Sequence, residues 1–244
     1  ILSKMDQYYG QAQQDKFVLN MLNHKKDGLF LEIGSSHPIE FSNTFLLEKK
    51  YNWRGIMVEY NPIFLPSYKK TRDRCLHVIN DATKVDYKSI FEKNNLPTNM
   101  DYLQIDLDAH NGSTLRTLEK LDRELFDKHK FATVTFEHDI YHSNFDNTRE
   151  KSRKIFDKRG YIRIFEDINN EGANPYEDWY VHPELIDMNL IQAIKNKNMK
   201  HYKHIKAIQT RPNRSNFSLN LNKNSNYNFN QFVNHSINWQ DIEY

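Results

Sequence analysis

The stretch DGLFLEIGSSHPIEFSNTFLLEKK, residues 27–50, contains the feature that decides the fold. An apolar run over Leu29–Ile33 has the length and composition of a buried strand, and Gly34 follows it directly. A helical stretch comes next over 44–50, where Ser42 is placed to cap the first turn. A strand that enters a helix through a glycine turn is typical of a βαβ unit, in which ligands bind beyond the carboxyl end of the strand.

Short apolar runs and helical segments continue to alternate as far as residue 182. Further strands are expected at 55–59, 75–79, 102–107, 131–137, 161–165 and 179–182. Further helices are expected at 3–23, 64–72, 86–94, 113–128 and 148–158. Strands that alternate with helices predict a mostly parallel sheet with helices on both faces, and continuously apolar strands agree with such cover. The predicted fold class is therefore α/β, with a sheet of seven strands.

Length and composition limit what kind of protein this is. The 244 residues suffice for one sizeable domain with an appendage, and the alternation gives way to an Asn- and Ser-rich tail, so we predict a domain over 1–210 and an extension over 211–244. A net charge of +2 does not favour a dedicated nucleic-acid binder. The single cysteine, Cys75, excludes an internal disulfide, and no apolar run reaches the length of a membrane span, so a cytoplasmic location is expected.

Acidic residues stand at the ends of three predicted strands, where a doubly wound sheet binds its ligand. Glu32 precedes the glycine turn, Glu59 ends the second strand and Asp81 follows the third. Glu59 lies 25 residues after Gly34, near the spacing at which an acid binds ribose hydroxyls. A turn with one glycine beside a glutamate suits a cationic nucleoside better than a pyrophosphate. These features predict S-adenosylmethionine as the ligand, with Asp81 accepting from the adenine amino group.

The segments YGQAQQDKFVLNML and GLFLEIGSSHPIEFSNTFLLEKKYNWRGIMVEYNP resemble the FkbM family of class I S-adenosylmethionine-dependent methyltransferases. The resemblance continues more loosely through YLQIDLDAHNGSTLRTL to YEDWYVHPEL. It implies a Rossmann-like sheet whose last strand is antiparallel, and O-methylation, often of sugars or polyketide-type natural products. By motif it implies cofactor-binding roles for Glu32, Gly34, Ser35, Ser36, Glu59, Asp81 and Ala82. Many members have Asp-x-Glu-Gly after the fourth strand, whereas this chain has Asp-Leu-Asp-Ala-His over 106–110, which leaves the acceptor open.

Methyl transfer to a hydroxyl requires alignment of the acceptor and removal of its proton. The catalytic candidates follow the fourth and fifth strands, whose carboxyl ends we expect side by side: Asp106, Asp108, Glu137 and His138. In one interpretation His138 or His142 is a general base; in another, the acids and His138 bind Mg²⁺ or Mn²⁺; in a third, they only cap turns and pack. An aromatic wall for a sugar ring, or simply core packing, is the expectation for Tyr176, Trp179, Tyr180 and His182.

The sequence thus predicts an S-adenosylmethionine-dependent O-methyltransferase for a carbohydrate or another small hydroxylated acceptor. An RNA or other nucleic-acid methyltransferase is the alternative that the basic runs at 24–26, 68–74 and 195–206 favour, although such runs are more often solvated helix faces. A nucleotide-dependent oxidoreductase is disfavoured by the glycine pattern. A non-catalytic module that retains the methyltransferase fold is a further alternative, and it would bind no S-adenosyl ligand.

Overall fold

The computed structural model describes residues 7–140, 147–169 and 174–196. The predicted boundary at 210, the extension over 211–244 and His142 lie outside these residues. The strands are β1 (Leu29–Ile33), β2 (Arg54–Glu59), β3 (Cys75–Ile79), β4 (Asn99–Ile105), β5 (Lys130–Glu137), β6 (Ile162–Ile168) and β7 (Glu177–Val181). The α-helices are α1 (Gln14–Met21), α2 (Phe45–Tyr51), α3 (Leu65–Thr71), α4 (Tyr87–Lys93), α5 (Ser113–Glu124), α6 (Thr148–Lys158) and α7 (Met188–Asn196).

The seven strands form one sheet in the order β3-β2-β1-β4-β5-β7-β6. The pairs from β3 to β5 are parallel, whereas β7 is antiparallel to both β5 and β6. The strand order reverses at β1, so the carboxyl ends of β1 and β4 meet at the point where open α/β sheets bind ligands. The predicted α/β class, the seven strands and the adjacency of the first, fourth and fifth strands are confirmed.

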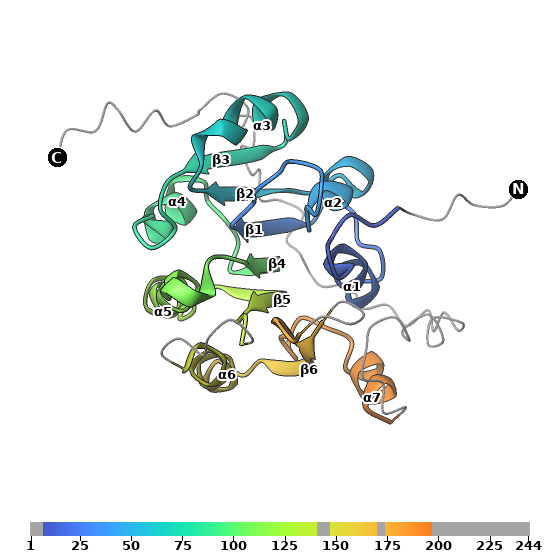
Figure 1. Cartoon of the computed structure of the whole chain (residues 1–244). Helices are drawn as coiled ribbons and strands as arrows, with labels where there is room; N and C mark the ends of the chain where they lie inside the picture. Colours follow the sequence, from blue (N-terminus) through green and yellow to red (C-terminus); the bar gives the residue numbers. More distant parts are fainter. Residues whose placement is uncertain (1–6, 141–146, 170–173, 197–244) are drawn as a thin grey trace, which may run out of the picture.

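Helices cover both faces of the sheet, as continuously apolar strands require. In Figure 1, α4, α5 and α6 lie along one face and α1, α2 and α7 lie along the other. One apolar core contains Phe91, Leu118 and Phe156 from the first set of helices, and the other contains Phe17 and Ile191 from the second. Successive side chains of a strand therefore enter different cores, and this alternation decides which acids can meet at the rim.

The first helix is shorter than the predicted span of 3–23. It begins at Gln14, because Gln13 has a left-handed backbone (φ 63°) and Gly10 forms an isolated bridge with Phe41. The described residues before α1 are thus not helical, and they lie beside the segment that follows β1. The helix Met188–Asn196 was not anticipated from the sequence. None of the described helices has the length and apolar character needed to cross a bilayer.

The edge of the sheet formed by β6 and β7 departs most from expectation. The sequence predicts that the sixth strand ends at residue 165, but β6 continues to Ile168 through register shifts against β7. Asp167, within this irregular stretch, has a left-handed backbone (φ 53°). The shifts bring polar side chains of β6 against α6, where they form ion pairs described below.

Candidate functional site

The glycine turn after β1 is fixed by the approach of β4. Gly34 has φ 85°, and a Cβ atom there would lie 1.7 Å from the carbonyl oxygen of Asp106. Only glycine fits, because any side chain would separate two paired strands at the reversal point of the sheet. The next residue, Ser35, is buried and hydrogen-bonds back to the carbonyl groups of Glu32 and Val58. The turn is therefore rigid before any ligand arrives.

Glu59, at the carboxyl end of β2, is oriented by two backbone donors. Its Oε2 accepts from the N–H of Ser36 and its Oε1 accepts from the N–H of Asn61, each at 2.8 Å. Ser36 reaches this position through a left-handed backbone (φ 48°) just after the glycine turn. A carboxylate has about four lone-pair sites, so each oxygen retains capacity for another donor. The partly exposed carboxylate is thus held in one orientation and keeps capacity for further donors.

Two large apolar side chains next to Glu59 were not singled out in the sequence. Tyr60 and Ile63 are 75% and 71% exposed, which is unusual for residues of their size in a folded domain. Both follow β2 at the ligand-binding edge of the sheet. The detectable signal in the sequence was an aromatic residue directly after an acidic strand end, which offers a flat surface for a base next to a sugar.

The residues after β3 mostly stabilise their own turn. Asp81 Oδ1 accepts from the N–H and the hydroxyl of Thr83, at 2.9 and 2.7 Å. Burial opposes ionisation of Asp81, but these hydrogen bonds and nearby Lys84 outweigh it and hold the pKa of Asp81 below its usual value. Ala82 is buried, and its carbonyl accepts from the hydroxyl of Tyr87. Asp81 remains at the rim as an ionised acceptor, and the role of Ala82 toward the ligand stays a prediction.

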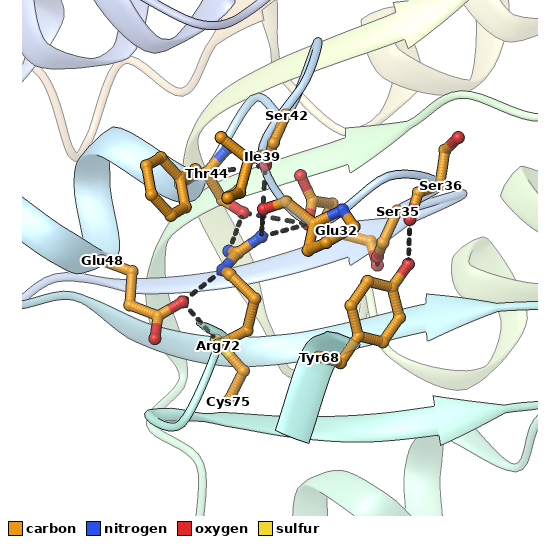
Figure 2. A network of polar contacts seen from close by, with 12 residues as sticks. Glu32, Ser35, Ser36, Ile39, Ser42, Thr44, Glu48, Tyr68, Arg72 and Cys75 are labelled. Atoms are coloured by element: carbon orange, nitrogen blue, oxygen red, sulfur yellow. Dashed lines mark hydrogen bonds and ion pairs between the residues drawn. The ribbon is translucent and has the colours of Figure 1, made fainter. Parts of the chain in front are cut away.

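Glu32 belongs to a buried ion network beneath the turn, shown in Figure 2. Its Oε2 accepts from the hydroxyl of Thr44 at 2.9 Å and lies 4.0 Å from Nη1 of Arg72, which is fully buried. Arg72 also donates to Glu48, which in turn accepts from the thiol of Cys75 at 3.2 Å. Burial raises the pKa of Glu32 to about 7 although Arg72 opposes the rise. Glu32 is therefore buried and supports the turn, and its role in lining the ligand stays a prediction.

Three carboxyl groups from β4, β5 and β7 form what we call the acid row: Asp106, Glu137 and Glu177. Asp106 directly follows β4, and Glu137 is the last residue of β5, the strand that pairs with β4. Glu137 is also in register with Glu177 on β7. Asp106 and Glu137 follow Ile105 and Phe136, which are paired in register, so the two carboxyl groups adjoin. Burial raises the pKa of Asp106, although nearby Glu137 opposes the rise. Burial and nearby Asp106 raise the pKa of Glu137 far above its usual range, and burial raises the pKa of Glu177 to about 8.

Two glutamines hold the acid row in place. Gln14, at the start of α1, donates from Nε2 to Oε2 of Glu177 at 2.9 Å. Gln104, on β4, opposes part of the rise in the pKa of Asp106, and its own Oε1 is buried without a hydrogen-bond partner among the described atoms. The sequence offered a weak signal for Gln14, since it lies in the Gln-Gln-Asp segment that carries the family resemblance. Nothing in the sequence alone indicated Gln104.

His138 does not join the acid row. It follows Glu137 directly, so its side chain enters the opposite layer, where Nε2 lies 3.4 Å from Asp167 Oδ1 and 3.6 Å from Asp178 Oδ1. The same two acids pair with Arg153, at 3.0 and 2.7 Å. Burial would raise the pKa of Asp178, but His138 and Arg153 outweigh it and hold that pKa far below the usual range. The predicted convergence of His138 with Asp106 and Glu137 is wrong, because strand side chains alternate between faces.

Asp108 is also separate from the acid row. It is exposed, and its carboxylate pairs with His110 Nδ1 at 2.6 Å and accepts from Asn111 at 3.2 Å. These contacts stay within the turn between β4 and α5. Of the four predicted catalytic residues, the structure brings together Asp106 and Glu137 only.

The predicted metal ligands do not form a metal-binding group. Among the described residues, the group of three ligand atoms within 4.8 Å of one another is His138, Asp167 and Asp178. Arg149 and Arg153 already donate to those carboxylates, so their negative charge is compensated without a metal ion. The residues therefore do not fit the predicted Mg²⁺ or Mn²⁺, and we derive no step through a metal.

The predicted aromatic wall belongs to the core. Every member of that set is buried: Tyr176, Trp179, Tyr180 and His182. Trp179 packs on Phe17 with ring centroids 4.7 Å apart, and Tyr180 packs on Phe156 at 4.3 Å. These rings fill the two layers beside β7 and cannot stack on a sugar.

The basic run at 68–74 is largely taken up by internal contacts. Arg72 lies in the ion network, and the side chain of Arg74 bonds to the carbonyl oxygens of Asn52 and Trp53. In the run at 24–26, Lys25 pairs with Asp101 at 2.6 Å. The run at 195–206 lies almost entirely outside the described residues. The described basic residues thus give little support to a nucleic-acid surface.

No protein-family model and no curated protein sequence matches this chain. Solved structures do. A Streptococcus mutans protein assigned as an S-adenosylmethionine-dependent methyltransferase is 13% identical with a TM-score of 0.50, over 70% of this chain and 48% of that one. A TehB-like S-adenosylmethionine-dependent methyltransferase from Corynebacterium glutamicum is 12% identical, with a TM-score of 0.46 over 72% and 89%.

A Clostridium thermocellum protein assigned as an rRNA methylase is 9% identical, with a TM-score of 0.48 over 72% of this chain and 99% of that one. At such identities the similarity concerns the fold alone. The chain therefore has the Rossmann-like fold of class I S-adenosylmethionine-dependent methyltransferases, as its strand order independently indicates. The narrower resemblance to the FkbM family stays a prediction.

Proposed function

We propose that this chain is an S-adenosylmethionine-dependent methyltransferase that methylates a hydroxyl group of a sugar or glycan. The observation that carries the proposal is the orientation of Glu59 beside the glycine turn. Its two oxygens are held by backbone donors from Ser36 and Asn61 and retain lone pairs for a vicinal diol.

The residues present fit a nucleoside with a positive charge. Glu59 would accept from the ribose hydroxyls, Tyr60 and Ile63 would flank the base, and ionised Asp81 would accept from its amino group. The acid row would face the cationic end of the ligand, because Asp106 adjoins Gly34 across the strand pair. When bound, S-adenosylmethionine supplies an activated methyl group on a positively charged sulfur.

Removal of the acceptor proton is assigned to the pair of Asp106 and Glu137. Asp106 would accept the proton as the methyl group is transferred, because burial raises its pKa and makes its ionised form a better proton acceptor than an ordinary carboxylate. Burial and the charge of Asp106 keep Glu137 protonated, so Glu137 would be the neutral partner of that base. Both side chains are partly exposed, as a base that contacts an acceptor must be. His138 and Asp108 have no part in this assignment.

Calorimetry with S-adenosylhomocysteine tests the cofactor site. Glu59→Ala should weaken binding by roughly 1.5–3 kcal/mol, because a charged hydrogen-bonding partner is lost. Glu92→Gln removes one negative charge from the exposed face of α4 and serves as the matched control, with unchanged affinity. If wild-type protein binds no S-adenosyl ligand, the fold serves a non-catalytic role and the proposal fails.

A further inference from the structure

Phe41, on the loop between β1 and α2, combines exposure with backbone strain. Its side chain is 70% exposed, and its backbone is left-handed (φ 58°). A bulky aromatic residue rarely adopts this conformation, and such strain is found mainly where a functional site requires it. Among the described residues, the other large apolar side chains that are exposed are Tyr60 and Ile63, after β2 at the same edge of the sheet. Phe41 has no part in the cofactor site to which those two are assigned.

The loop around Phe41 is held in place by the buried ion network. Nη1 of Arg72 donates to the carbonyl of Pro38 and to the hydroxyl of Ser42, each at 3.2 Å. Ser42 directly follows Phe41 and is buried, and its Oγ also accepts from the N–H of Phe45 at 3.2 Å. The backbone at Phe41 is therefore fixed before a ligand arrives, so binding to its ring costs little conformational entropy.

The N-terminal segment places Phe41 close to the acid row. Gly10 pairs with Phe41, and a Cβ atom on Gly10 would lie 2.7 Å from Oε1 of Gln14. Nε2 of Gln14 donates to Glu177, which is in register with Glu137 at the end of β5. These contacts link the loop after β1 to the start of β7, and β4 and β5 lie between those two strands in the sheet. Phe41 thus lies at the rim of the region in which the acceptor must react, because the proposed base directly follows β4.

The surroundings of Phe41 favour a sugar ring as its ligand. The residues next to the Gly10–Phe41 bridge include Gln11 and Glu40, which are polar and exposed. A protein or membrane partner would require a contiguous apolar patch, which one ring among polar groups does not provide. A pyranose has C–H groups on its faces and hydroxyl groups at its rim. One aromatic ring can cover such a face while neighbouring polar groups bind the hydroxyls.

We propose that Phe41 binds the acceptor by stacking on one face of a pyranose ring, which directs a hydroxyl group of that ring toward Asp106. The identification of this sugar as the methyl acceptor rests on the proposed function. The binding of a pyranoside at Phe41 does not, because it requires no methyl transfer. The strained backbone of Phe41 lowers the stability of the fold and is retained because the ring must lie at this position.

The binding test uses saturation-transfer NMR with the full-length chain and S-adenosylhomocysteine. The probes are the methyl pyranosides of D-glucose, D-galactose, D-mannose and N-acetyl-D-glucosamine, with D-glucitol as an open-chain polyol that has no ring face. We expect at least one pyranoside to bind, with the strongest transfer to its ring C–H protons, and D-glucitol not to bind. Absence of binding by every pyranoside, or equal binding of D-glucitol, would overturn the proposal.

Substitutions at Phe41 separate ligand binding from a structural role. Phe41→Asn removes the ring and introduces a residue that tolerates a left-handed backbone. It should weaken pyranoside binding at least about tenfold and leave the melting temperature unchanged or higher. Phe41→Trp retains an aromatic face and should retain binding. A side chain that only stabilises the fold would behave differently, since its loss in Phe41→Asn would lower the melting temperature and leave the binding of the sugar intact.

Tyr60→Asn is the matched control, because it removes an exposed ring of the proposed cofactor site. It should weaken binding of S-adenosylhomocysteine and leave pyranoside binding, measured without that ligand, unchanged. Equal loss of pyranoside binding in Tyr60→Asn and Phe41→Asn would refute the assignment to Phe41.

Three further outcomes distinguish this proposal from others. If catechol binds at Phe41 and the pyranosides do not, the ligand is an aromatic ring and the proposal fails. If the wild type dimerises in sedimentation velocity and Phe41→Asn does not, the ring belongs to an interface and the proposal fails. If S-adenosylhomocysteine does not bind but the pyranoside still requires Phe41, only the proposed function is overturned.

Discussion

Two sets of acids lie on the same side of the sheet and have different surroundings. Beneath the glycine turn, Glu32 and Glu48 surround one buried arginine, and every side chain in the network has hydrogen-bond partners. Across β4, β5 and β7, the acid row has an amide donor from Gln14 but no ion pair with a described basic residue.

This comparison distinguishes acids whose charge only stabilises the fold from acids that can still bind a ligand or accept a proton. A buried carboxylate that is already neutralised by an arginine gains little free energy from binding a ligand. Removal of either partner of such a pair destabilises the fold. A carboxylate that has no such cation beside it can accept a proton or bind a cation. Until it does so, its burial lowers the stability of the fold. The following changes probe this distinction, from the largest expected effect to the smallest.

Asp106→Asn should have the largest effect, on turnover. Without this carboxylate the pair cannot take up the acceptor proton, so methyl transfer should slow by about 10²–10⁴-fold. Affinity for S-adenosylhomocysteine should fall much less, since Glu59 is unchanged and only one acid near the ammonium end of the ligand is lost. Single-turnover rates and calorimetry measure the two quantities. Wild-type turnover in this variant would show that the acid row is not the base.

Arg72→Met should have the largest effect on stability. It leaves Glu48 and Glu32 buried without their cation, which should lower the free energy of unfolding by about 3–5 kcal/mol. Urea denaturation measures the change, and Lys70→Met, on the exposed face of α3, is the matched control with little effect. A small decrease in the free energy of unfolding of Arg72→Met would mean that Arg72 does not neutralise Glu32 and Glu48 as their contacts indicate.

Glu177→Gln should change how stability depends on pH. The pKa of Glu177 is raised to about 8 by burial, so the folded state favours its protonated form. That contribution is fully present below the ordinary glutamate pKa and is lost as pH rises through about 8. Glutamine mimics the protonated form, so the variant should gain roughly 1–3 kcal/mol over the wild type at pH 9 and little at pH 4. Parallel pH profiles for the two proteins would contradict the assignment.

His138→Asn should affect turnover least, by less than about tenfold. Its ring lies in the layer of α6 with Asp167 and Asp178, away from the acid row. A general base in contact with the acceptor would instead cost 10²-fold or more. Rates are compared below the melting temperature of the variant, so that a loss of stability does not count as a loss of chemistry. A decrease of 10²-fold or more would restore His138 as a catalytic candidate.

Much of the fold and part of the site follow from local sequence. Gly34 between a buried strand and a helix, and Glu59 at the end of the next strand, could be located because turn geometry and strand spacing act over short distances. The adjacency of the first, fourth and fifth strands was also predictable, because a doubly wound sheet reverses its strand order at the first strand. The start of α1 was not, because Gly10 contacts Phe41, a residue far along the chain.

The sequence by itself determined the parallel sheet, the rigid glycine turn and the presence of acids at the strand ends. Only the tertiary structure decided which of those acids are neutralised. Glu32 lies beside Arg72 and Asp178 pairs with Arg153 through contacts between separate segments of the chain. Glu137, in contrast, lies beside Asp106 and Glu177. A strand fixes only the face on which a side chain lies, and the charge that faces it comes from elements packed against that face. The separation of Glu137 from His138, adjacent in sequence, is the clearest consequence.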